Sequence, residues 1–163
     1  MALQNANSRI FHSKAGEKMI DKFIAKFTEE KIPYIKIKNK YFLENKELME
    51  LSKKLNCKIE AASLYLGEEN ETFKPSLALL EILARTSKEK VFLNDIGEID
   101  FIYGRKKLGK RHIKSIQGNN NRKLVQNEHD ENLGYCKIID EDKIKNVLDR
   151  GDFLRREKNQ KRA

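Results

Sequence analysis

Basic side chains are concentrated in one short span of this sequence. Between Phe101 and Lys123 there are eight Lys or Arg and no Asp or Glu. The span therefore holds +8 of the formal net charge of +9, and all other residues together sum to +1. A proteome-wide preference for lysine would spread the excess charge along the chain. Its confinement instead predicts a local anionic partner, with nucleic acid and acidic lipid as the general candidates.

Part of this span has a spacing that would align its cations on a helix. If residues 105–114 form a turn followed by a helix, Leu108, Ile113 and Ile116 can anchor that helix to a core. RNA affinity begins with Lys and Arg displacing condensed counterions, so a stripe of cations predicts a surface that follows phosphates. The alternative is an ordinary solvated basic face. The four cations at positions i, i+3, i+4 and i+7 of the stripe are Lys107, Lys110, Arg111 and Lys114.

A second basic cluster lies near the end of the sequence. It comprises Arg155, Arg156, Lys158, Lys161 and Arg162, with Glu157 as its acidic member. Lys161 and Arg162 can equally be read as a basic tail. Arginine offers bidentate phosphate contacts and can stack on an unpaired base, and Tyr103 is a second candidate for base stacking or else a packing residue. The predicted RNA-contacting residues are Tyr103, Arg105, Lys106, Lys107, Lys110, Arg111, Lys114, Arg155, Arg156 and Lys158.

No residue pattern in the sequence indicates catalysis. His12, His112 and His129 have no metal-ligand spacing, and Cys57 and Cys136 have no nearby Cys or His that would complete a zinc site. Phosphate-binding glycine loops and the G-x-S-x-G nucleophile motif are missing as well. We therefore expect a protein without enzymatic activity, cofactor or metal, whose acidic runs are solvated loops. Two separated cysteines are typical of an intracellular protein with reduced thiols.

The hydrophobic spacing predicts an α+β protein in two parts. Helices are expected over Ser13–Phe27, over Asn45–Leu55 and from Pro75 onward, and the leucines at 77, 79, 80 and 83 form the inner face of the last. Beyond residue 88 the pattern changes to short strands, which predicts a small barrel. The expected domains are a mixed α/β domain over 1–88 and a β domain over 89–163. Residues 59–66 are expected as a strand or an extended segment. The other predicted strands cover residues 34–37, 41–43, 91–93, 99–103, 124–125, 134–139 and 144–148.

Several motifs occur in the order found in a known family. The segments FIYGRKKLGKRHIKSI (101–116), NLGYC (132–136) and DRGDFLRRE (149–157) resemble parts of a PUA domain, a β pseudobarrel that binds RNA. Upstream, LYLGEENETF (64–73) resembles the N-terminal domain of the Nip-seven family of ribosome-biogenesis factors. The resemblance runs from about Asp21 to Glu157. It implies a pre-PUA α/β domain followed by a C-terminal PUA domain.

The resemblance also implies a function. Members of this family act without catalysis in the biogenesis of the large ribosomal subunit, so we expect single-stranded pre-rRNA and ribosome-assembly proteins as partners. It implies that the last strand lies near the basic helix, which would bring the two basic clusters together. The short chain favours an archaeal, cytoplasmic protein over a nuclear or nucleolar one. No apolar stretch approaches the roughly 20 residues of a membrane helix, and no secretory signal is evident.

Two alternatives remain open at this stage. The protein could be an adaptor whose basic face meets an acidic protein. It could also be an RNA-modifying enzyme with a PUA appendage, in which case residues 1–88 must hold the catalytic groups.

Overall fold

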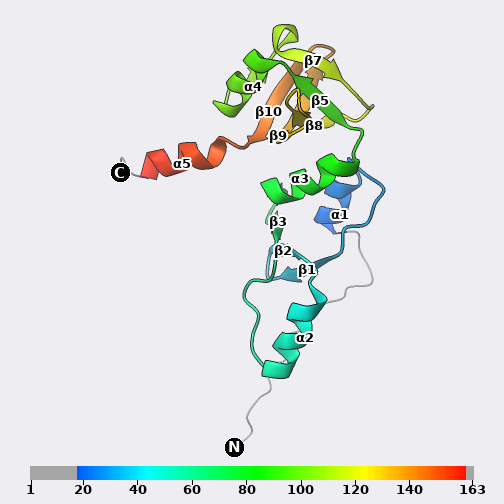
Figure 1. Cartoon of the computed structure of the whole chain (residues 1–163), viewed down its shortest axis with the longest axis vertical. Helices are drawn as coiled ribbons and strands as arrows, with labels where there is room; N and C mark the ends of the chain where they lie inside the picture. Colours follow the sequence, from blue (N-terminus) through cyan, green and yellow to red (C-terminus); the bar gives the residue numbers. More distant parts are fainter. Residues whose placement is uncertain (1–17, 161–163) are drawn as a thin grey trace, which may run out of the picture.

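The computed structural model describes residues 18–160, which form an α+β structure with two β-sheets (Figure 1). The first sheet has the strand order β1-β2-β3-β4 and the second has the order β6-β10-β9-β8-β5-β7. The α+β class is therefore as expected. Ser13–Glu17 of the first predicted helix, and the cations Lys161 and Arg162, lie outside the described residues.

The first sheet is a series of antiparallel strands with a helix beside it. Its strands are β1 (Tyr34–Ile37), β2 (Lys40–Leu43), β3 (Tyr65–Glu69) and β4 (Phe73–Pro75). Helix α2 (Lys46–Leu55) begins where the Asn45 side chain accepts a hydrogen bond from the Leu48 amide, as its sequence predicts. Of residues 59–66, expected as a strand or an extended segment, only Tyr65 and Leu66 pair, in β3. Ile59 and Ala62 before them pack into a small core with β1 and β2.

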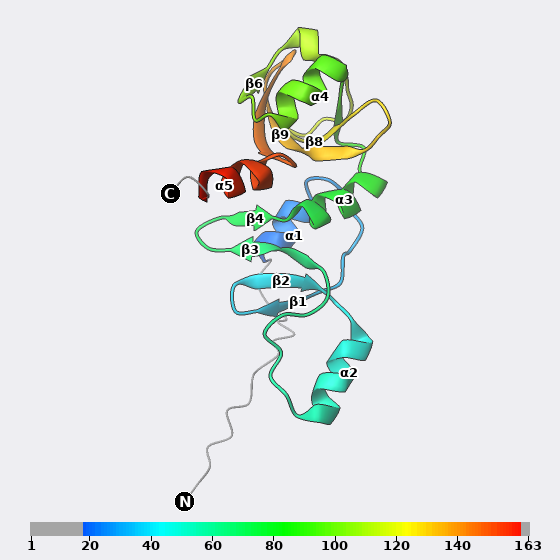
Figure 2. The same ribbon diagram turned by 60° about the vertical axis from the view of Figure 1, so that its left-hand side comes forward.

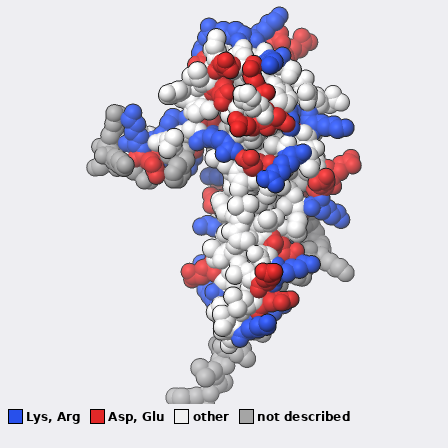
Figure 3. All heavy atoms as spheres, viewed as in Figure 1, with Lys and Arg blue, Asp and Glu red and all other residues white. Residues whose placement is uncertain are grey.

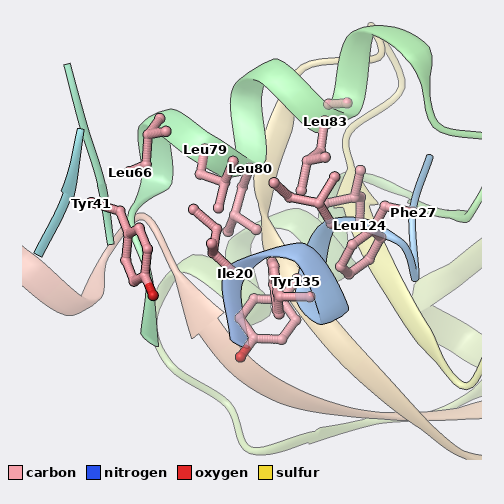
Figure 4. Close-up of a cluster of buried hydrophobic side chains, with 12 residues drawn as sticks. Ile20, Phe27, Tyr41, Leu66, Leu79, Leu80, Leu83, Leu124 and Tyr135 are labelled. Carbon is pink, nitrogen blue, oxygen red and sulfur yellow. The ribbon is translucent and has the colours of Figure 1, made fainter. Parts of the chain in front are cut away.

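Helix α3 (Leu77–Thr86) lies between the two sheets and supplies the centre of the larger core. It begins at Ser76, whose hydroxyl accepts from the Leu79 amide, and it fully buries Leu79, Leu80 and Leu83. Helix α1 (Met19–Ile24) packs into the same cluster. Figure 4 shows that Leu124 and Tyr135 of the second sheet also belong to this core. The predicted domain boundary near residue 88 stays a prediction. The strands before it belong to the first sheet and those after it to the second, but the larger core contains residues from both sides.

The second sheet curls into part of a barrel (Figure 2). Four predicted strands are confirmed, as β5 (Lys90–Leu93), β8 (Arg122–Gln126), β9 (Asn132–Asp140) and β10 (Lys143–Asp149). Strands β5 and β8 run parallel, whereas β8, β9 and β10 pair antiparallel. Two further strands, β6 (Lys107–Leu108) and β7 (Ile113–Ile116), lie at the edges of the sheet. Helix α4 (Asp95–Ile102) packs on the curled sheet and α5 (Asp152–Gln160) follows β10.

Two predictions about this half are wrong. Residues 99–103, expected as a strand, belong largely to α4, because the Asn94 side chain accepts from the Gly97 amide and starts a helix whose Phe101 is buried. The helix expected over residues 105–114 is instead β6, a 3-10 turn over Lys110–His112 and the start of β7. Leu108 pairs with Ile144 of β10, and this tertiary pairing outweighs the local helical spacing.

Candidate nucleic-acid interface

The four cations of the predicted stripe are not aligned on a helix, because residues 107–114 form β6, a 3-10 turn and the start of β7. Of the eight cations between Phe101 and Lys123, three are neutralised by carboxylates. Lys123 is 2% exposed and its ammonium contacts the Glu89 carboxylate. Arg105 pairs with Asp100 at 2.6 Å, and Lys114 pairs with Glu128 at 3.2 Å. Only part of the charge excess is therefore available to a partner.

The other five cations of the span have no carboxylate within 4.0 Å among residues 18–160. They lie on β6 and the residue before it, in the 3-10 turn and on β8, and on the face in Figure 3 basic and acidic side chains are interspersed. Arg122 is half-buried and the others are exposed. The five are Lys106, Lys107, Lys110, Arg111 and Arg122.

The second predicted cluster lies on α5, and its members differ in role. The Arg155 guanidinium donates to the Asp149 carboxylate at 2.8 Å and to the Ile102 carbonyl, so it fastens α5 to β10 and α4. The hydrogen bond with Asp149 raises the pKa of Arg155. Arg156 is 74% exposed and pairs with Asp152 at 2.6 Å, and Lys158 is exposed. Arg156 and Lys158 therefore remain at the surface, whereas Arg155 is largely engaged within the protein.

Tyr103 and Gly104 lie where α4 turns toward β6. Tyr103 ends α4 and is 80% exposed, so it does not pack in the core, and its predicted stacking role stays a prediction. Gly104 has a φ of +85°, and a Cβ at this position would lie 2.7 Å from the Arg155 guanidinium carbon. The absence of a side chain at Gly104 therefore permits this turn and leaves space for Arg155.

We expect Gly104→Ala to lower the free energy of unfolding by about 1–2 kcal/mol, because an L-residue is disfavoured at this positive φ. Gly109→Ala is the matched control. Its φ is −111°, and a built Cβ meets no described atom within 4 Å. Denaturant unfolding of both variants tests this, and equal losses of stability would contradict it.

The register of the second sheet creates a grouping that the sequence analysis missed. Lys107 of β6 lies directly opposite Lys145 of β10, Lys145 lies opposite Lys137 of β9, and Lys137 lies opposite Arg122 of β8. Directly paired residues project from the same face of a sheet, so these cations form a line across four neighbouring strands. At about 4.8 Å per strand the line spans roughly 14 Å. We call these four residues the cation row.

The cation row is not compensated by acids. None of its members has a carboxylate partner within 4.0 Å among residues 18–160, and its three lysines are exposed. Like charges directly opposite on a sheet destabilise it. At the β8 end, burial and, to a smaller extent, the positive charge of Arg122 lower the pKa of Lys26. An anion lying along the row would relieve this repulsion.

Sequence alternation indicated the exposure of these lysines but not their alignment. Lys145 lies between the buried Ile144 and Asn146, and Lys137 follows the buried Cys136, which is typical of a strand with one solvated face. Which lysine faces which depends on strand register.

Two of the residues that the sequence analysis considered for chemistry, His112 and Cys136, are buried. His112 is buried, its Nδ1 accepts from the Gly109 amide, and its Nε2 lies 3.0 Å from Asp100. Burial raises the pKa of Cys136 to about 12. Within residues 18–160 there is no group of three His, Cys, Asp or Glu placed to hold a metal, and no helix there is long and apolar enough to cross a membrane.

The chain is similar to an archaeal protein described as a UPF0113 protein, from Archaeoglobus fulgidus. The two are 33% identical over 109 residues, which cover 60% of this chain and 63% of the relative. The chain thus matches less than two thirds of the relative's length. No family model matches the chain.

Proposed function

We propose that this protein is a non-catalytic RNA-binding factor of the Nip-seven type, acting in the biogenesis of the large ribosomal subunit. The ordered motifs between Asp21 and Glu157, the α+β structure with a partial barrel and the similarity to an archaeal UPF0113 protein support this proposal. The observation that carries it is the cation row. In the proposal the second sheet is a PUA-type barrel, pre-rRNA and assembly proteins are the partners, and the cytoplasm is the compartment.

The chemistry of the row fits a nucleic-acid backbone. Four cations in one line match a linear array of phosphates, and each contact releases condensed counterions. Ile139 of β9 and Val147 of β10 are exposed on two of the strands that carry the row, and they offer apolar contacts beside the charges. The row itself holds no aromatic pair of the RNP type, so its contacts are with the backbone rather than with a strict sequence.

An adaptor function has one observation in its favour. Ile96, Ile99 and Tyr103 lie along α4 at helical spacing, and they are 61%, 56% and 80% exposed. Such a stripe is suited to a protein contact. It is compatible with RNA binding elsewhere on the molecule, since assembly factors need both kinds of partner.

Direct titration tests the proposed function. We expect the full chain to bind labelled single-stranded RNA, with log K falling linearly against log salt, because phosphate contacts release about 0.7 counterions each. Fluorescence anisotropy at several salt concentrations measures this, with an acidic polypeptide of equal charge as competitor. If the acidic polypeptide competes as well as RNA does, or if RNA does not bind at low salt, the adaptor function is favoured.

A further inference from the structure

A groove opens at the β8 end of the cation row. It has a volume of about 740 Å³ and lies between the β3–β4 hairpin, the outer face of β8–β10 and the first turn of α5. Its lining includes Arg122, which is also the last member of the row, and Arg156 of α5. The groove and the row therefore share a side chain and form one continuous surface.

The charges in the groove differ from those of the row. Three cations line it, Arg122, Arg156 and Lys74, and three carboxylates line it as well, those of Glu68, Asp149 and Asp152. Asp149 is already paired with Arg155, which leaves three cations against two carboxylates, so opposite charges nearly balance here, whereas the row has cations alone. A phosphate would gain little from entering the groove. A neutral group with both hydrogen-bond donors and acceptors suits it better.

Flat surfaces in the groove are suited to a planar ligand. Three aromatic side chains contribute to its lining. Tyr65 of the hairpin is 36% exposed, Phe73 is partly buried, and Tyr135 of β9 is 5% exposed because it also belongs to the larger core. The Arg122 guanidinium lies 6.0 Å from the centre of the Tyr135 ring, and Arg156 is held by Asp152 at 2.6 Å. Aromatic rings and guanidinium planes are the groups on which unpaired bases stack in RNA-binding proteins.

We propose that this groove receives one unpaired nucleobase of an RNA strand whose phosphates lie along the cation row. The inference rests on the proposed function and adds a second contact of different chemistry. The base stacks on Tyr65 and on the guanidinium planes of Arg122 and Arg156, and its edge meets the carboxylates of the groove. The volume lies within the usual range of ligand pockets, roughly 300–1,000 Å³.

The test compares two RNA probes of equal length and charge with the full-length protein. One is a single-stranded RNA and the other is the same sugar-phosphate chain without bases. We expect the intact RNA to bind roughly 10-fold tighter, since stacking of one base contributes about 1–3 kcal/mol. The salt slopes of the two probes should be the same, because their phosphates are the same.

Two groove variants outside the row locate this preference. Tyr65→Ala, which leaves the charge unchanged, and Arg156→Gln should each reduce the preference for intact RNA by several-fold. Arg85→Gln, at an exposed position in the last turn of α3, is the control for the lost charge and should keep the preference. Circular dichroism checks that Tyr65→Ala is folded. If it is not, Arg156→Gln alone provides the test of the groove.

The outcomes separate this inference from the proposed function. If the wild-type protein binds neither probe, the proposed function fails. If it binds both probes equally, RNA binding stands and the groove has no role in it. If the wild-type preference survives in both groove variants, the base lies elsewhere and the inference is overturned.

Discussion

Replacing Lys107, Lys137 and Lys145 together with glutamine should weaken binding of single-stranded RNA roughly 100-fold at 0.1 M salt. Each lost phosphate contact should also reduce the salt slope by about 0.7, so the triple variant should have a slope shallower by about 2. These lysines come from three adjacent strands and lie directly opposite one another. Anisotropy titrations over a range of salt concentrations measure both quantities.

The same variant should gain stability while it loses RNA affinity. It removes three direct like-charge pairs, Lys107 with Lys145, Lys145 with Lys137 and Lys137 with Arg122. Each cross-strand pair typically contributes about 0.2–1 kcal/mol, so denaturant unfolding should show a small increase. If the lysines had only a structural role, the variant would instead lose stability.

A charge-matched triple variant controls for net charge. Lys46, Lys54 and Lys58 are exposed on or just after α2, away from the second sheet. Their replacement with glutamine should leave the affinity within about 3-fold and should leave stability nearly unchanged, since exposed charges contribute little. If the two triple variants lose affinity equally, the row has no special role and binding follows net charge.

Replacing Glu89 with alanine should lower the free energy of unfolding by about 3–5 kcal/mol. Glu89 lies just before β5 and contacts the ammonium of Lys123, which is 2% exposed. Without Glu89 that ammonium stays buried and uncompensated. The carboxylate also accepts from the backbone amides of Asn119 and Asn120 at 3.2 and 2.9 Å, so the substitution frees two further donors. Urea unfolding of the wild type and the variant gives the difference.

Two further variants show whether the loss comes from the buried charge. Lys123→Met combined with Glu89→Gln removes both ions, and we expect it to recover more than half of the lost stability. Glu128→Ala breaks the exposed pair with Lys114, whose side chain is 57% exposed, and should cost less than about 1 kcal/mol. A Glu89→Ala loss as small as that of Glu128→Ala would show that the Lys123 ammonium reaches water.

The Glu89 contacts also predict an acid sensitivity. Burial by itself would raise the pKa of Glu89, but hydrogen bonds from Lys123 and from the Asn120 and Asn119 amides outweigh it and hold the pKa below its usual value. A carboxyl with a depressed folded-state pKa stabilises the protein above its unfolded-state pKa and loses that contribution as the pH falls. The stability of Glu89→Gln should therefore fall less steeply below about pH 4.5.

The contacts of Glu89 also link the cation row to the rest of the fold. Asn120 of the three-asparagine run also donates from its side chain to the Lys26 carbonyl, just after α1. Glu89 therefore organises the loop that precedes Arg122 and Lys123. The first of these ends the cation row on the outer face, and the second is buried beneath the sheet. Neighbouring residues of one strand thus have opposite surroundings, as the alternation of side chains requires.

The sequence by itself determined the parts of this protein that depend on local interactions. Helices α2 and α3 begin at Asn45 and Ser76, whose side chains accept hydrogen bonds from amides three residues on. The strands β5, β8, β9 and β10 follow from short apolar runs between turns. The confinement of positive charge to residues 101–123 is likewise a property of the sequence. Each depends on residues only a few positions apart.

The tertiary structure alone decided which cations lie together. Residues 105–114 have helical spacing, yet Leu108 pairs with Ile144 and is buried in the core of the second sheet. The same pairing places Lys107 opposite Lys145, and β9 then adds Lys137. Strand register is set by partners distant in the sequence, and a slip of one residue would turn each lysine to the other face. Charge content is therefore fixed by composition, whereas the cation row exists only through pairing in the folded sheet.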